Sequence, residues 1–99
     1  MAREIPLPHP GVVLKEEFLE PMGISVYAAA KATGIARSQL NRVCHGDLNI
    51  TAPMALRLGK YLNVDAKWFM NMQVTFDLVS SNESLQSELQ AIDPIKSAA

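Results

Sequence analysis

Residues 25–46, SVYAAAKATGIARSQLNRVCHG, decide the fold that we predict for this chain. The hydroxyl of Ser25 is suited to cap a helix over residues 26–33, because it can accept a hydrogen bond from a first-turn amide. Gly34 suits the left-handed conformation in which such a helix ends, and Ile35 can fill the gap before the next helix. The segment is therefore expected to form two short helices joined by a tight turn, the layout of a helix-turn-helix.

The second of these helices is expected to begin after Ala36, and its two sides differ in chemistry. Successive helical residues are turned by about 100°, which places Leu40 and Val43 beside Ala36 on an apolar side. The opposite arc, roughly 140° wide, contains only polar side chains: Arg37, Ser38, Asn41, Arg42 and His45. Arg, Asn and Ser can bond to base edges or phosphates in the major groove of DNA. The arc predicts a DNA-reading helix; the alternative is an ordinary solvated helix face.

Seven polar residues of the motif have a predicted role in DNA binding. The residues expected to read bases are Arg37, Ser38, Gln39, Asn41 and Arg42, of which Gln39 lies near the buried edge of the helix. Ser25 and His45 are expected to contact phosphates.

The overall composition is that of one small globular domain, with 99 residues, 48% hydrophobic content and a net charge of −1. The charge is unevenly distributed, because residues 31–60 contain five basic side chains against Asp47 alone, a balance of +4. A modest positive face on an acidic body favours specific, salt-sensitive binding over indiscriminate coating of nucleic acid.

Enzymatic and metal-binding classes find little support in the sequence. Cys44 and His45 are neighbours on a helix, so their side chains diverge by about 100° and cannot act as a nucleophile and its base. Neither His9 nor His45 has a metal-ligand partner at a suitable spacing, and there is no glycine-rich phosphate loop. A single cysteine excludes an internal disulfide. Because there is no leader-like or membrane-spanning apolar run, we expect a cytoplasmic protein. Because the ligand spacings and the phosphate loop are missing, we expect no cofactor or metal.

Helices are also expected on both sides of the motif. Pro10 suits the first turn of a helix in which Leu14 and Phe18 form the core face. Thr51 can cap a later helix that ends near Asn63. The apolar residues predicted to line this later helix are Leu56, Gly59 and Leu62, with Ala55 and Leu58 nearby.

The last long helix is expected from residue 66 to about residue 79, capped by Asp65, and it is apolar on two sides. One arc contains Trp68, Phe69, Met72, Phe76 and Val79, and the nearly opposite arc contains Met70, Val74 and Leu78. One face can fill the core of the domain. The second face, Met70, Val74 and Leu78, is predicted to form a two-fold homodimer, because such a contact buries the same patch twice. The alternative is a fully buried helix.

The composition changes after residue 79, where serines replace the apolar pattern. We therefore divide the chain into a DNA-binding domain, residues 1–79, and a C-terminal extension, residues 80–99. Leu85, Leu89 and Ile92 are at helical spacing, so the extension is either a short amphipathic helix or a loosely held tail.

Five separated stretches resemble the HigA-type antitoxins, the plasmid-maintenance or VapI branch of the Xre-like DNA-binding proteins. They are His9-Pro10-Gly11, EEFLEPMG (16–23), Ile50-Thr51-Ala52, ALRLGKYL (55–62) and WFMNMQ (68–73). The resemblance covers about residues 8–79 and implies an all-helical, five-helix lambda-repressor-like domain with a short C-terminal extension. It further implies a homodimer on a palindromic double-stranded operator, repression of its own operon, and neutralisation of a HigB-type toxin, an mRNA-cleaving ribonuclease.

Two positions depart from the family pattern. Ala36 occupies the N-cap of the recognition helix, where Ser, Thr or Pro is frequent, and Val26 replaces a frequent phosphate-binding glutamine, so Val26 is assigned no DNA contact. The acidic run of Glu16, Glu17 and Glu20 is either a solvated face or a docking patch for the basic ribonuclease. Two rival functions stay open: a transcriptional regulator without a toxin, and a protein-interaction module that no longer reads DNA.

Overall fold

A computed structural model describes residues 7–96 of the chain. Its elements are α1 (Pro10–Val13), the π-helical segment η1 (Leu14–Leu19), α2 (Val26–Thr33), α3 (Arg37–Cys44), α4 (Ala52–Leu62), α5 (Ala66–Ser84) and α6 (Gln86–Gln90). No strand occurs among the described residues. Because η1 continues α1 without a break, the prediction of an all-helical, five-helix domain is confirmed by α1 to α5. The predicted limits at residues 1 and 99 lie outside the described part.

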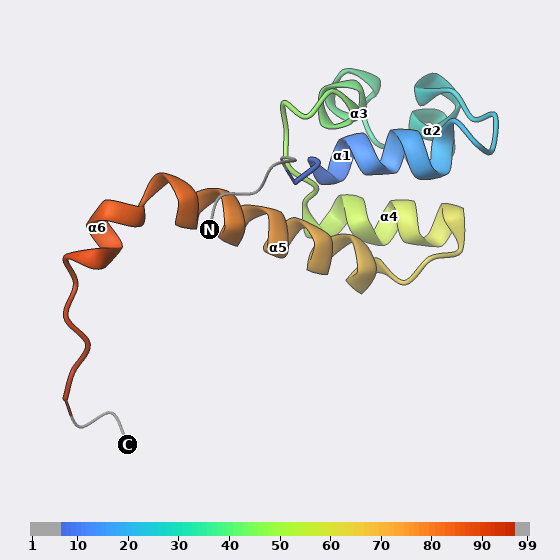
Figure 1. Ribbon diagram of the computed structural model, residues 1–99. Coiled ribbons are helices and arrows are strands. Elements are labelled where there is room, and N and C mark those ends of the chain that lie inside the picture. The colour runs from blue at the N-terminus through green and yellow to red at the C-terminus, as the bar shows by residue number, and fades with distance from the viewer. Residues whose placement is uncertain (1–6, 97–99) are drawn as a thin grey trace.

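The first helix forms the centre of the domain. Figure 1 shows α1 and η1 between α2 and α3 on one side and α4 and α5 on the other. Leu14, Leu40 and Leu58, from three different layers, are completely buried, and Phe69 of α5 joins them in one continuous core. Full burial of such a side chain contributes about 1.5–3 kcal/mol, so this core holds the helix-turn-helix segment against the other helices.

The core face of the first helix differs from the prediction. Leu14 is buried as expected, but Leu19 is the second core residue, and Phe18 is only partly covered. The reason is the π-helical hydrogen bonding of η1, in which the Glu20 amide donates to the Lys15 carbonyl at 2.9 Å. This wider turn brings residues five apart onto one side of the helix, and the four-residue spacing used for the prediction does not apply.

One of the apolar residues predicted to line α4, Leu56, lies outside its core face. Leu56 is 64% exposed, whereas Met54, Ala55, Leu58, Gly59 and Leu62 are buried. The stripe toward the core is centred on Ala55 and Leu58, and Leu56 is turned by about 100° from its neighbour Ala55. The predicted ends of the helix are confirmed, since the Thr51 hydroxyl accepts from the Met54 amide and Asn63 is left-handed with φ 58°.

Helix α5 is longer and turned differently than expected. The Asp65 carboxylate caps it by accepting from the Lys67 amide at 2.9 Å, as predicted. Of the predicted core arc, Phe69 is buried and Met72, Phe76 and Val79 are partly buried. Trp68 is 43% exposed, and Gln73 is the second buried position instead. The helix continues past Val79 to Ser84, because serine at an exposed helical position costs only a few tenths of a kcal/mol, about the same as many other residues.

The second half of α5 and the short helix α6 project from the domain, as Figure 1 shows. Every described residue from 81 to 96 is exposed. The domain boundary predicted at residue 79 falls within α5 and stays a prediction. None of the described helices is long and apolar enough to cross a membrane.

Helix α1 approaches α3 so closely that Gly11→Ala is expected to destabilise the domain, although alanine normally favours a helix over glycine by about 1 kcal/mol. A Cβ at position 11 would overlap the backbone carbonyl oxygen of Val43. Because two backbones must then separate, we expect the free energy of unfolding to fall by about 2–3 kcal/mol, measured by thermal denaturation.

The matched comparison for this substitution is Gly23→Ala. Nothing lies near a Cβ at position 23, so only the strain of its φ of 69° remains, about 1–2 kcal/mol. An unchanged Tm for Gly11→Ala would contradict the close approach of α1 and α3.

Candidate nucleic-acid interface

The turn between α2 and α3 is fixed by hydrogen bonds and by one left-handed glycine. Gly34 has φ 79° and ends α2. The buried Thr33 hydroxyl donates to the Ala29 carbonyl at 2.7 Å and accepts from the Ile35 amide at 3.3 Å. The Arg57 guanidinium of α4 donates to the Thr33 carbonyl at 2.8 Å. The angle between the two helices is therefore held from inside the turn and from a neighbouring helix.

Helix α3 is anchored on one side and open on the other. Leu40 and Val43 are completely buried, and Cys44 is 3% exposed. The polar residues predicted to read bases are all exposed: Arg37, Ser38, Gln39, Asn41 and Arg42. Ala36 is the N-cap and makes no side-chain capping bond. The first turn of α3 therefore has amides that no side chain caps, beside side chains that reach outward.

The two predicted phosphate contacts lie in different surroundings. Ser25 caps α2 by accepting from the Ala28 amide at 3.0 Å, which leaves its hydroxyl proton free to donate. His45, at the C-terminal end of α3, has its Nδ1 2.8 Å from the Asn41 carbonyl oxygen. Because a carbonyl oxygen only accepts, Nδ1 carries the proton in this contact, and Nε2 can donate to a phosphate only when the ring is the doubly protonated imidazolium.

Cys44 has the properties of a core residue. Burial raises the pKa of its thiol, an effect that the Lys15 ammonium offsets only in part. The thiolate, which is the nucleophilic form of cysteine, is therefore disfavoured. Among residues 7–96, no group of three His, Cys, Asp or Glu side chains is arranged to hold a metal ion.

Sequence reasoning missed Tyr27, which lies beside the recognition helix. Its ring centroid is 5.5 Å from the Arg37 guanidinium carbon, a cation–π distance. Together with Val26, Ser38 and Asn41, these two residues line a groove between α2 and α3. A helical wheel shows the residues of one helix only, so it cannot reveal a contact between Tyr27 of α2 and Arg37 of α3.

Sequence reasoning also missed the role of Gln73, which α5 places under the loop that follows α3. Its side-chain oxygen accepts from the Ile50 amide at 2.7 Å, and its side-chain nitrogen donates to Asp77 at 3.0 Å. Gln73 is 3% exposed, and an unpaired amide at such a site would be costly. The hydrogen bond between Ile50 and Gln73 therefore holds the loop that follows α3 against α5.

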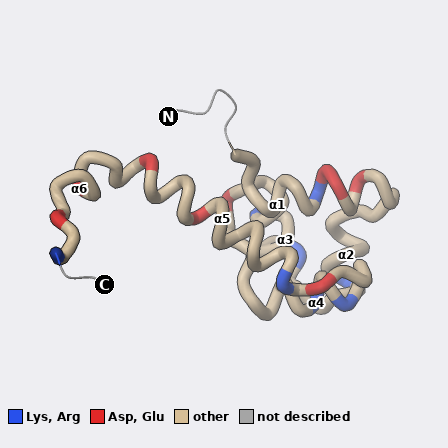
Figure 2. The backbone as a smooth tube through the Cα atoms, turned by 60° about the horizontal axis from the view of Figure 1, so that its bottom comes forward, with Lys and Arg blue, Asp and Glu red and all other residues tan. Residues whose placement is uncertain are grey.

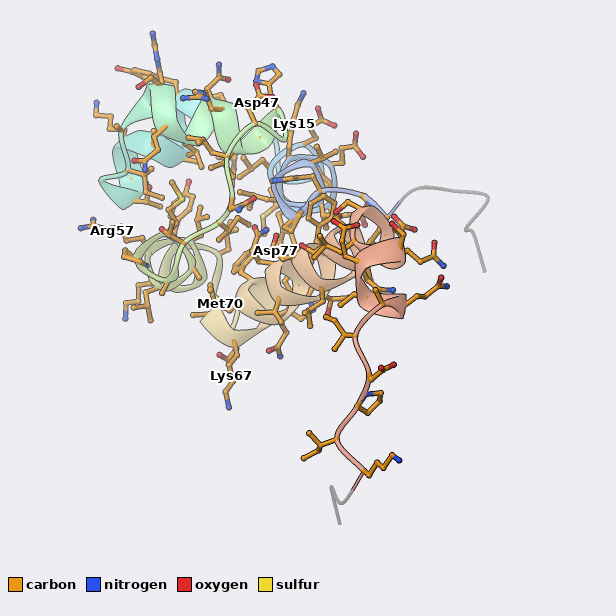
Figure 3. All side chains as sticks on the ribbon, turned by 90° about the vertical axis from the view of Figure 1, so that its left-hand side faces the viewer. Lys15, Asp47, Arg57, Lys67, Met70 and Asp77 are labelled. Atoms are coloured by element: carbon orange, nitrogen blue, oxygen red, sulfur yellow. The ribbon has the colours of Figure 1, made fainter. Side chains whose placement is uncertain are left out.

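The charges of the protein are separated in space as they are in sequence. Figure 2 shows most basic residues around α2, α3 and α4, and most acidic residues along η1, the second half of α5 and α6. Lys15 lies on the acidic η1, and Asp47 and Asp65 follow α3 and α4 on the basic side. Lys67 is a further exception, since Figure 3 shows it pointing into solvent at the end of the domain away from α3. The polar edge of α3 thus belongs to the basic side of the molecule.

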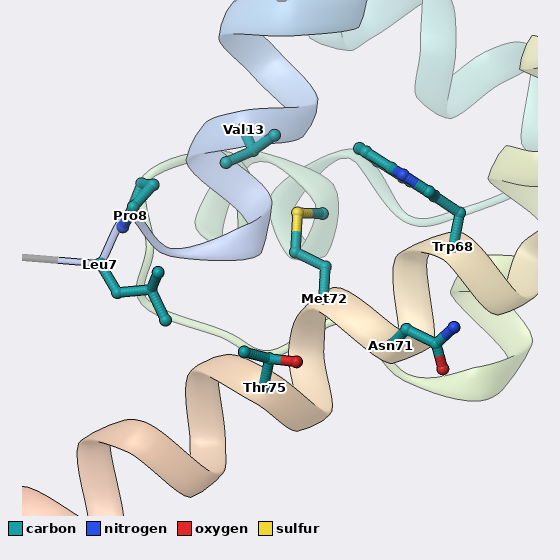
Figure 4. Close-up of a pocket in the computed structure, with 7 residues that line it drawn as sticks. All are labelled: Leu7, Pro8, Val13, Trp68, Asn71, Met72 and Thr75. Carbon is teal, nitrogen blue, oxygen red and sulfur yellow. The ribbon is translucent and has the colours of Figure 1, made fainter.

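An apolar pocket lies away from α3, between the start of the first helix and α5. Figure 4 shows its lining: Leu7, Pro8, Val13, Trp68, Asn71, Met72 and Thr75. A neighbouring hollow shares Pro8, Val13 and Trp68 and is bordered by Glu16 and Glu17. The two hollows form one apolar surface with an acidic rim.

Comparisons with known proteins agree with this geometry. A helix-turn-helix family model (HTH_3) matches residues 15–69. Virulence-associated protein I of Dichelobacter nodosus is 41% identical over 97% of this chain and 88% of its own length. Antitoxin HigA-1 of Vibrio cholerae is 35% identical over 86% of this chain and 80% of its own length. The solved structure of Pseudomonas aeruginosa antitoxin HigA with the higBA promoter superposes with a TM-score of 0.86 at 31% identity, covering 90% of this chain and 98% of the other.

Proposed function

Because this chain belongs to the helix-turn-helix family of HigA-type antitoxins, we propose that it binds an operator as a homodimer, represses its own operon and neutralises a HigB-type ribonuclease toxin. The observation that carries the DNA-binding part is the exposed polar edge of α3 on a buried anchor. The proposed base-reading residues are Arg37, Ser38, Gln39, Asn41 and Arg42, and the proposed phosphate contacts are Ser25 and His45.

Dimerisation through α5 is supported by the apolar side chains that the domain leaves uncovered. Val74 is 50% exposed and Leu78 is 66% exposed. Met70 is partly covered by the core of its own domain, so it contributes at the edge of the interface. A two-fold contact buries this patch twice and offers two α3 helices to DNA half-sites about 34 Å apart.

The test of operator binding is a fluorescence-anisotropy titration with DNA from immediately upstream of the gene and a scrambled duplex. We expect selective binding with two chains per site and an affinity that falls as salt rises, because phosphate contacts release counterions. Equal, weak binding to both duplexes would contradict operator reading and favour a protein-interaction module.

The toxin-binding part of the proposal uses the apolar surface with the acidic rim. A ribonuclease must carry basic groups, because its substrate is a polyanion. Glu16 and Glu17 border an apolar hollow that contains the 43%-exposed Trp68, so this surface suits a partner segment with basic and apolar side chains. None of its residues belongs to α3, and a toxin bound there leaves the DNA-reading edge free.

The double substitution Glu16→Lys/Glu17→Lys is expected to abolish neutralisation of the toxin encoded beside this gene, because like charges at an interface cost several kcal/mol, about 2–5 here. Growth of cells that express both proteins measures this loss, and operator affinity is expected to remain. The control is Glu88→Lys/Asp93→Lys on the projecting segment, which changes the net charge equally. Equal protection by the two double variants would contradict docking at the acidic rim.

A further inference from the structure

The groove between α2 and α3 contains one aromatic residue, Tyr27, beside the first residue of the recognition helix. Tyr27 is 57% exposed, so its ring is not held there by the core. The structure records a cation–π contact of 5.5 Å between this ring and the Arg37 guanidinium. Ser38 and Asn41, two further proposed base-reading residues, line the same groove.

We propose that Tyr27 is a positioning residue that sets the base specificity of Arg37. The inference rests on the proposed reading of DNA by α3. According to this proposal, the ring of Tyr27 restricts the Arg37 side chain to the orientation in which the guanidinium N–H groups face the DNA.

The physical basis is the flexibility of a surface arginine. An unrestrained arginine side chain has a large rotamer entropy. This entropy is lost when the N–H groups of its planar guanidinium pair with the two acceptors of a guanine edge. A ring against the face of the guanidinium leaves the N–H groups at its edge available. No capping side chain precedes Arg37, because Ala36 occupies the N-cap. Among the described residues, the Tyr27 ring is the recorded contact of the Arg37 guanidinium, so it can orient Arg37 before DNA binds.

The test compares base discrimination, not only affinity. The best binding sequence is first selected from a random duplex pool with the native full-length chain, and each base pair of one half-site is then replaced in turn. We expect Tyr27→Leu to reduce discrimination about three- to fivefold at a single position, the one at which Arg37→Ala removes it. Tyr27→Phe keeps the ring and is expected to keep the native profile.

A double-substitution cycle separates positioning from a general role in folding. Once Arg37 is alanine, Tyr27→Leu is expected to have no further effect at that base pair. A uniform loss of affinity on all duplexes, or additive effects of the two substitutions, would overturn the inference and leave operator reading intact. A flat profile for the native chain would overturn the proposed function, and this inference with it.

Discussion

Replacing Arg37 and Arg42 together by alanine is expected to lower operator affinity at least about 30-fold, because each base or phosphate contact of such a side chain contributes about 1–3 kcal/mol. Both residues are exposed on α3, away from its buried anchor. The fold is therefore expected to survive, with an unchanged circular dichroism spectrum and nearly the same Tm. Anisotropy titrations at several salt concentrations measure the loss, and the dependence on salt should also become weaker.

The control for this double variant removes the same charge elsewhere. Lys67→Ala/Lys96→Ala takes two exposed basic side chains from outside the region of α2 to α4, and Lys67 points away from α3 in Figure 3. We expect this control to bind the operator nearly as the native chain does. If the two double variants bind equally well, α3 is not the DNA-reading helix.

The second large effect is expected from Val74→Glu/Leu78→Glu, which places four carboxylates in the proposed two-fold interface. The dimer should dissociate into folded monomers, since both side chains are exposed within one chain and glutamate is a good helix former. Loss of the second half-site contact should reduce operator affinity by about 10²–10⁴. Sedimentation equilibrium measures the mass, and anisotropy measures the DNA affinity.

Met22→Glu/Leu56→Glu is the matched control for the interface. These side chains are 56% and 64% exposed, close to the exposure of the pair on α5, so the control adds the same charge at equally accessible positions. It should keep the mass of a dimer. A dimer that persists in Val74→Glu/Leu78→Glu would move the interface away from this face of α5.

Local chemistry made much of the fold predictable from the sequence. Ser25, Thr51 and Asp65 each cap the helix predicted for them, because a capping bond involves residues only two or three apart. Gly34 ends α2 in the left-handed conformation for the same local reason. The exposed edge of α3 followed from helical periodicity, since Leu40 fixes which side is buried.

Features that join distant segments were not predictable in this way. Trp68 was assigned to the core, but the packing of the other helices against α5 leaves Trp68 partly exposed and buries Gln73. The bond from Ile50 to Gln73 and the contact of Tyr27 with Arg37 each connect different elements. Their residue types indicate what they can bond to, but only the packed structure determines the partner.

The π-helical segment η1 affects how this chain must be aligned with other sequences. A π-helical turn contains about one residue more than an α-helical turn, and here it lies between the two buried leucines Leu14 and Leu19. A homologue whose first helix is α-helical throughout would require a one-residue gap in this segment. In an alignment on Leu14 without that gap, the partly covered Phe18 would be matched to the core position that Leu19 fills here, and residue-by-residue transfer from homologues would be shifted by one along the acidic run.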